Sequence, residues 1–157
     1  MRIETPRCLI RGFEEEDLDE FMAYRNDGCW MLYQGFKGRT REEFRKALLG
    51  EANWDEGAQL AVSDRATGRL IGDVYLRREG ESFWIGYTVS PGNARRGYAS
   101  EAVQGAIGWI RACGARRVLA NAYPENKSSR NLLNKLGFAF SGFDERGQAC
   151  YALELCP

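Results

Sequence analysis

Two arginines and a glycine, Arg95, Arg96 and Gly97, form the group of residues in this sequence that most clearly suggests a binding site. They follow residues 83–89, a run typical of a strand, and precede apolar residues spaced as on one face of a helix. The N–H groups at a helix start lack partners within the helix and carry about half a positive charge, so they attract anions. The sequence therefore predicts a phosphate site on the main chain of residues 95–100, with a solvated glycine turn as the alternative. The candidate residues are Arg95, Arg96, Gly97, Tyr98, Ala99 and Ser100.

A second strand followed by a helix carries two further polar candidates, Asn126 and Ser129. Residues 117–123 form the strand-like run, and asparagine is a favoured residue at a helix N-cap. Leucines at helical spacing follow, and Gly137 is placed to end the helix. We therefore expect Asn126 and Ser129 at a helix start, where they either cap the helix or contact a ligand.

The remaining pattern predicts a mixed fold of the α+β class. Thr40 and Glu43 form a capping box that begins a helix, and the order of strands and helices indicates a mostly antiparallel sheet with helices on both faces. The expected strands are residues 8–11, 59–63, 70–76, 83–89, 117–123, 139–143 and 150–155. The expected helices begin near residues 15, 41, 98 and 127.

The composition excludes several classes of protein. The chain has 157 residues, and 22 Lys plus Arg balance 22 Asp plus Glu, so no net field favours nucleic acid or an anionic membrane. The absence of histidine excludes His-dependent triads and most catalytic metal sites. Five scattered cysteines without a CxxC pair argue against a disulfide framework or a zinc site. The missing histidine and the scattered cysteines lead us to expect no metal. No apolar stretch has the length of a signal peptide or a membrane span, so we expect a cytoplasmic protein.

Together the two strand–helix units resemble the GCN5-related N-acetyltransferase (GNAT) superfamily, and within it the RimJ/RimL-like branch. The acyl-CoA pyrophosphate loop of this family is similar to RRGYASEA, residues 95–102, and its second motif to residues 126–138. Its first strand and helix are similar to IETPRCLIRGFEEEDLDEF, and its central hairpin to ATGRLIGDVYL. The resemblance covers nearly the whole chain in the family's order. It implies that residues 1–157 form a single N-acetyltransferase domain.

This resemblance implies a GNAT fold of about seven strands, with the fourth and fifth strands splayed apart. It also implies an acetyl-CoA-dependent enzyme in which an amine attacks the thioester directly in a ternary complex. In such an enzyme residues 95–100 hold the pyrophosphate, Asn126 holds the pantetheine, and Ser129 donates to the departing sulfur as the catalytic residue. Main-chain groups beside the pantetheine arm are expected at Tyr87, Thr88 and Val89.

Three positions depart from the family's pattern. Ala94 replaces the glutamine or arginine that often opens the pyrophosphate loop, and Trp84 replaces an acidic residue common on the fourth strand. Asn134 falls where many members have a tyrosine that acts as a general acid. These departures leave a non-catalytic acyl-CoA-binding or regulatory module as the alternative to an enzyme.

The motifs leave the general base and the acceptor unidentified. Asp73, Glu81 and Glu125 are candidate bases, but each is expected at the surface or in a turn. At pH 7 about a tenth of an α-amine is neutral, against about four in ten thousand for lysine, so a site without a strong base favours the α-amine. We expect an amine acceptor, either a peptide N-terminus or a small molecule, and a monomer or a homodimer. A further set of residues is aromatic, and its members either line a groove for the acceptor or pack in the core: Trp30, Tyr33, Phe36, Trp54 and Trp84.

Overall fold

A single mixed sheet forms the centre of the computed structural model, which describes residues 1–156. Within this range the sheet has eight strands in the order β1-β2-β3-β4-β5-β6-β8-β7. All neighbouring pairs are antiparallel except β5 and β6, which run parallel. The strands are β1 (Arg2–Glu4), β2 (Cys8–Arg11), β3 (Ala58–Asp64), β4 (Leu70–Glu79), β5 (Ser82–Val89), β6 (Arg117–Ala122), β7 (Ala139–Phe143) and β8 (Ala149–Glu154). The mostly antiparallel sheet is thus confirmed, and β1 is the strand that the sequence pattern did not predict.

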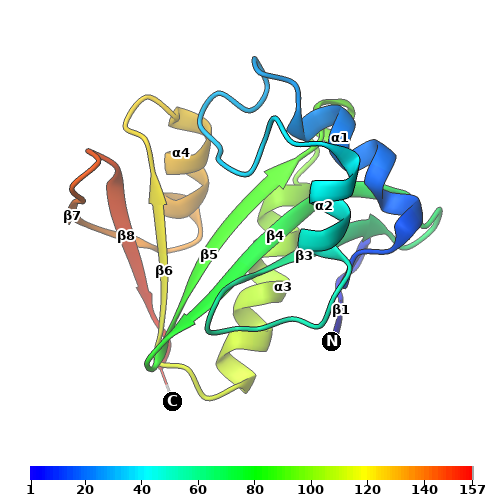
Figure 1. Cartoon of the computed structure of the whole chain (residues 1–157). Helices are drawn as coiled ribbons and strands as arrows, with labels where there is room; N and C mark the ends of the chain where they lie inside the picture. The colour runs from blue at the N-terminus through cyan, green and yellow to red at the C-terminus, as the bar shows by residue number, and fades with distance from the viewer. Residues whose placement is uncertain (157) are drawn as a thin grey trace.

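Helices cover both faces of the sheet, as expected (Figure 1). The helices are α1 (Leu18–Arg25), α2 (Arg41–Leu48), α3 (Tyr98–Ala112) and α4 (Lys127–Lys135), with 3₁₀ turns at Glu15–Asp17 and Pro91–Asn93. Helices α1 and α2 share one core with one side of β3 and β4, and α3 and α4 share the other core. Side chains that alternate along β3 show the division, because Leu60 and Val62 face α3 while Ala61 faces α1 and α2.

Strands β5 and β6 separate part of the way along their length. Their pairing runs only from Ser82 opposite Arg117 to Trp84 opposite Leu119. Beyond Trp84, β5 continues to Val89 while paired only with β4, and the two strands diverge toward the upper edge of the sheet in Figure 1. This separation is the splay expected between the fourth and fifth predicted strands, which are β5 and β6 in the structure.

Two helix starts follow the local signals in the sequence. The Thr40 hydroxyl accepts the Glu43 N–H at 3.2 Å, and the Glu43 carboxylate accepts the Thr40 N–H, which completes a capping box at α2. At α4 the Asn126 side chain accepts the Ser129 N–H at 3.3 Å. Over residues 1–156, no helix combines the length and the apolar character that a bilayer crossing requires.

Candidate active site

The end of β5 directs main-chain groups into the gap between β5 and β6. The Ser90 N–H donates to the Ile71 carbonyl at 2.8 Å, so Ser90 and, by alternation, Thr88 bond toward β4. Tyr87 and Val89 lie at the intervening positions, and their N–H and C=O groups therefore point toward the gap. The Val89 carbonyl accepts the Trp30 indole N–H at 2.9 Å. An extended ligand that bears amides can pair with the remaining groups as an added strand would.

A cleft of about 500 Å³ joins this gap to the start of α3 and to the first turns of α4. Arg96 is the one predicted cofactor-binding residue outside its lining: Arg96 is exposed, and its carbonyl accepts the Arg7 Nη1–H at 2.9 Å. Lining residues that sequence reasoning did not select include Gln34, Ser128 and Lys135. The predicted residues that line the cleft are Tyr87, Thr88, Val89, Arg95, Gly97, Tyr98, Ala99, Ser100, Asn126 and Ser129.

The loop before α3 has an uncommon backbone. Arg95 adopts φ = 62° and Gly97 adopts φ = 80°, both in the left-handed region. This conformation costs a non-glycine residue free energy and is found most often at functional sites. Left-handed residues also curve the chain so that successive N–H groups form a concave site for an anion, here at the positive end of α3. The loop therefore has both the shape and the field of a phosphate site.

Arg7 and Glu101 support this loop from the side of β1 and β2. The Glu101 carboxylate, in the first turn of α3, accepts the Thr5 hydroxyl at 2.6 Å and the Arg7 Nε–H at 2.7 Å. The Arg7 guanidinium also lies over the Tyr98 ring, 4.2 Å from its centre. Partial burial raises the pKa of Glu101, but hydrogen bonds from Thr5 and Arg7 and the charge of Arg7 outweigh it, so the pKa is lowered. Sequence reasoning missed this pair, which is separated by 94 residues.

Ser129 and Tyr87 meet at the inner end of the cleft. The Ser129 Oγ lies 2.8 Å from the Tyr87 hydroxyl, which joins α4 to β5 across the splay. Burial raises the pKa of Tyr87 to about 12, although the hydrogen bond with Ser129 opposes the shift. Both hydroxyls are therefore protonated at neutral pH.

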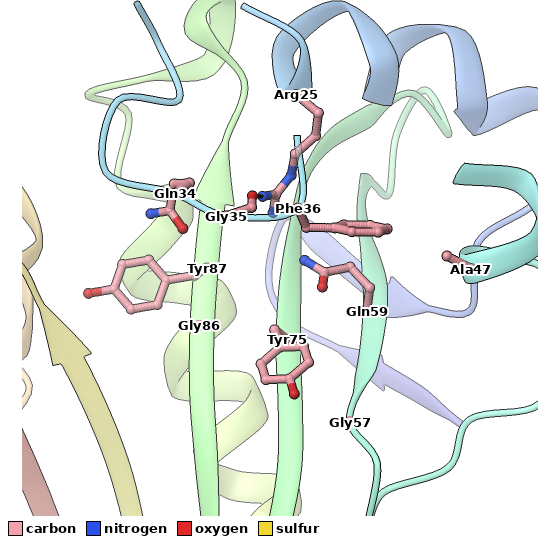
Figure 2. Close-up of a pocket in the computed structure, with 10 residues that line it drawn as sticks. All are labelled: Arg25, Gln34, Gly35, Phe36, Ala47, Gly57, Gln59, Tyr75, Gly86 and Tyr87. Atoms are coloured by element: carbon pink, nitrogen blue, oxygen red, sulfur yellow. Dashed lines mark hydrogen bonds between the residues drawn. The ribbon is translucent and has the colours of Figure 1, made fainter. Parts of the chain in front are cut away.

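A second cavity of about 420 Å³ opens on the other side of β5, beneath α1 and α2 (Figure 2). It shares Gln34 and Tyr87 with the cleft, and the same two residues line a third cavity of about 170 Å³. Figure 2 shows Gln34 beside the Tyr87 ring, with Gln59 and Tyr75 further along the cavity. Tyr87 and Gln34 therefore form a boundary that the cleft shares with the second cavity, and this shared boundary is called the junction.

Asp73 is buried and is bonded to residues that line the second cavity, which corrects the expectation of a surface position. Its side chain accepts hydrogen bonds from Tyr24 and Gln59 and forms an ion pair with Arg25. The pattern placed Asp73 at the surface because a lone carboxylate is rarely buried, but partners from other elements compensate its charge here. Arg25 Nη1 in turn donates to the Gly35 carbonyl at 3.0 Å. Asp73 thus holds two residues of the cavity lining, Arg25 and Gln59, and is not a free base.

The other candidate bases and the departures from the family pattern lie away from the junction. Glu81 and Glu125 are exposed, as expected, and neither lines the three cavities described here. Asn134 is exposed on α4, outside the same cavities, whereas Ala94 lines the cleft. Within residues 1–156, no group of three or more Asp, Glu, Cys or His side chains is arranged to hold a metal.

The aromatic candidates for an acceptor groove divide into two sets. Trp30 and Tyr33 line the cleft, and Phe36 lines the second cavity. Trp54 instead packs on Trp109 of α3, with ring centres 5.0 Å apart. Trp84 donates its indole N–H to Glu79 at 3.1 Å, and neither Trp54 nor Trp84 lines these cavities. Of these five aromatic residues, only Trp30, Tyr33 and Phe36 therefore lie where they could contact an acceptor.

Comparison with known proteins identifies the family. Residues 7–139 match the model of the "Acetyltransferase (GNAT) domain". The chain belongs to the GNAT acetyltransferase family. The uncharacterized N-acetyltransferase YnaD of Bacillus subtilis (strain 168) is 33% identical over 146 residues, which cover 91% of this chain and 85% of YnaD. This GNAT protein is therefore an acetyltransferase, and its acetyl donor is acetyl-CoA.

Solved structures show the same fold. A GNAT-family acetyltransferase from Bacillus anthracis has a TM-score of 0.87 and 25% identity, with 98% of each chain covered. A structure described as RimL, a ribosomal L7/L12 alpha-N-protein acetyltransferase in complex with coenzyme A, has a TM-score of 0.85 at 14% identity, with 99% of this chain and 98% of RimL covered. The RimL fold is the one that the resemblance to the RimJ/RimL-like branch implies.

Proposed function

We propose that this enzyme transfers the acetyl group of acetyl-CoA to the α-amine of a peptide, or to another weakly basic primary amine, by direct attack in a ternary complex. The observation that carries the proposal is the junction at Tyr87 and Gln34, where the cleft and the second cavity meet. A donor and an acceptor that occupy two cavities sharing this boundary are held next to each other. Such positioning removes much of the entropic barrier to reaction.

The residues of the cleft suit coenzyme A. We assign the pyrophosphate to the main-chain N–H groups of residues 95–100 and to the side chain of Arg95, and the pantetheine amides to the main chain of Tyr87 and Val89. Asn126 borders the same path from α4. When bound, acetyl-CoA supplies an acetyl group activated as a thioester. A main-chain N–H of β5 is suited to stabilise the charge that develops on the thioester oxygen.

The second cavity suits an acceptor that carries little extra positive charge. Gln34 and Gln59 supply amide groups, and Tyr75 supplies a phenol. Arg25 is the one residue in this lining with a fixed charge, and its partner is Asp73. A lining without an unpaired carboxylate offers a cationic amine no strong base and no counter-ion. We therefore favour an α-amine, of which about a tenth is neutral at pH 7, over a lysine side chain.

Ser129 is the proposed donor to the departing sulfur. Its hydroxyl lies at the junction, and its N–H is held by Asn126. As the amine nitrogen bonds to the carbonyl carbon, the C–S bond breaks and its electron pair goes to sulfur. A hydrogen bond from Ser129 stabilises this thiolate, and the proton lost by the amine ends on the thiol. No covalent bond to the enzyme forms in this sequence.

Coenzyme A release in the presence of short peptides, Nα-acetyl-lysine, polyamines and other small amines tests the proposal. Peptides with a free N-terminus are expected to react faster than the lysine side chain. Initial-velocity lines at varied donor and acceptor should intersect, whereas parallel lines would rule out the ternary complex. Coenzyme A binding without turnover on any amine would favour the non-catalytic module, although the family match and the relatives named N-acetyltransferases favour the enzyme.

A further inference from the structure

We propose that Tyr87 is a positioning residue, whose phenolic O–H donates to Ser129 Oγ and so leaves the Ser129 proton directed at the leaving sulfur. This inference rests on the proposed function, because it assigns to Tyr87 the orientation of the group that stabilises the thiolate. Tyr87 itself is not required to lose its proton.

The geometry places the two hydroxyls in contact at the site of reaction. The Tyr87 hydroxyl lies 2.8 Å from Ser129 Oγ and 3.4 Å from the Ser129 carbonyl oxygen. Tyr87 lies on β5, opposite Val74 of β4, so its position is fixed by the sheet. Tyr87 also lines all three cavities at this end of the sheet. No other side chain forms such a contact with Ser129 Oγ within residues 1–156.

The direction of the hydrogen bond follows from the chemistry of the two groups. A hydroxyl has one proton and two lone pairs, so Ser129 can accept from Tyr87 and still donate to a third atom. Phenol is the more acidic of the two hydroxyls and is the stronger donor. Burial raises the pKa of Tyr87 to about 12, which keeps this donor protonated throughout the neutral range. The arrangement thus leaves the serine proton free at the moment that sulfur gains charge.

Ser129 would otherwise rotate among several positions. A serine side chain on the first turn of a helix has three staggered rotamers, and its hydroxyl proton points into the cleft in only some of them. A fixed hydrogen bond from Tyr87 restricts that choice before the donor binds. The expected benefit is in the chemical step, because Tyr87→Phe keeps the ring and removes only the oxygen.

Steady-state kinetics of Tyr87→Phe, Ser129→Ala and the double variant test the inference. Tyr87→Phe is expected to lower kcat by about 3- to 10-fold, the value of one hydrogen bond, with KM for acetyl-CoA nearly unchanged. Because Tyr87 acts through Ser129, the double variant should be no slower than Ser129→Ala. An unchanged kcat in Tyr87→Phe, or losses that multiply in the double variant, would overturn the inference.

Tyr151→Phe is the matched control, since Tyr151 is a tyrosine whose hydroxyl also has a side-chain hydrogen-bond partner, but here it accepts from Arg130 and does not contact Ser129. Its kcat should equal that of the unaltered enzyme, and coenzyme A affinity should be the same in all four variants if they are folded. If Ser129→Ala does not lower kcat, the proposed role of Ser129 fails and the inference fails with it. If Ser129→Ala lowers kcat and Tyr87→Phe does not, only the inference fails.

Discussion

Arg25 Nη2 lies 2.5 Å from Asp73 Oδ1, and the two side chains are only 4% and 0% exposed. This ion pair fastens the end of α1 to the middle of β4. Through its Nη1–H bond to the Gly35 carbonyl, Arg25 also fixes the loop that carries Gln34 to the junction of the cavities. The stability of the fold and the shape of the second cavity therefore depend on the same pair.

Replacing Asp73 with Asn should destabilise the fold strongly. The change leaves the buried Arg25 charge without its partner, and loss of one member of a buried pair costs about 3–5 kcal/mol. Urea denaturation measures the free energy of unfolding. The control is Asp55→Asn, which removes an exposed ion pair with Arg78 and should cost far less, because solvent screens the two charges. Equal losses in the two variants would contradict the structural role assigned to Asp73.

Gly97→Val should weaken coenzyme A binding by about tenfold or more, which corresponds to about 1.4 kcal/mol. Valine strains a residue at φ = 80° and places a branched side chain beside the phosphate position. Gly114→Val is the control, because Gly114 has φ = 83° at the far end of α3, with open space around it. Calorimetric titration should show reduced affinity in Gly97→Val alone, and unchanged affinity there would refute the phosphate loop.

Glu101→Gln should make stability less sensitive to acid. The pKa of Glu101 is lowered from its ordinary value of 4.5 in the folded state, so the unfolded chain takes up the proton first as pH falls. The stabilisation by Glu101 is therefore present above that ordinary value and is lost as pH falls through the lowered one. Denaturation curves between roughly pH 6 and pH 3 should be flatter in pH dependence for the variant. A variant with the same acid slope as the unaltered protein would argue against this linkage.

Gly72→Ala should destabilise the sheet where β4 meets the end of β5. A Cβ at Gly72 would lie 2.1 Å from the Thr88 carbonyl oxygen and 2.9 Å from the Val89 Cα, so the backbone must shift. Such overpacking costs about 1–3 kcal/mol. In Gly86→Ala, by contrast, the new Cβ would meet the Tyr75 Cβ at 3.5 Å, an ordinary contact. Thermal unfolding of the two variants should differ, and coenzyme A affinity should fall only for Gly72→Ala.

The sequence predicts well those features that depend on neighbours along the chain. The strand before Pro91, the capping box at Thr40 and the N-cap at Asn126 each arise from a few adjacent residues, and each occurs where expected. The glycine loop before α3 belongs to the same group, because a helix start and a glycine are local signals, while phosphate binding by this loop stays a prediction. The splay was implied by family resemblance, not by the residues themselves.

Features that depend on distant partners could not be predicted in this way. Asp73 is polar and lies in a strand, and only its contacts with Tyr24 and Arg25, 49 and 48 residues away, explain its burial. The support of the phosphate loop by Arg7 has the same origin. The position of Glu101 in the first turn of α3 indicates that its charge stabilises the helix start, but no local pattern predicts that Arg7 is its partner. The contact between Tyr87 and Ser129 likewise requires the packing of α4 on the sheet.

The separation of β5 from β6 beyond Trp84 also bears on how such an enzyme can change during evolution. The atoms presented there belong to the polypeptide backbone, which every residue possesses. Substitutions along this edge therefore alter the shape around the substrate while leaving the same amides and carbonyls in place. In a protein with this arrangement, side-chain substitutions can change which acceptor is accepted while the main-chain groups available to the acetyl donor stay the same.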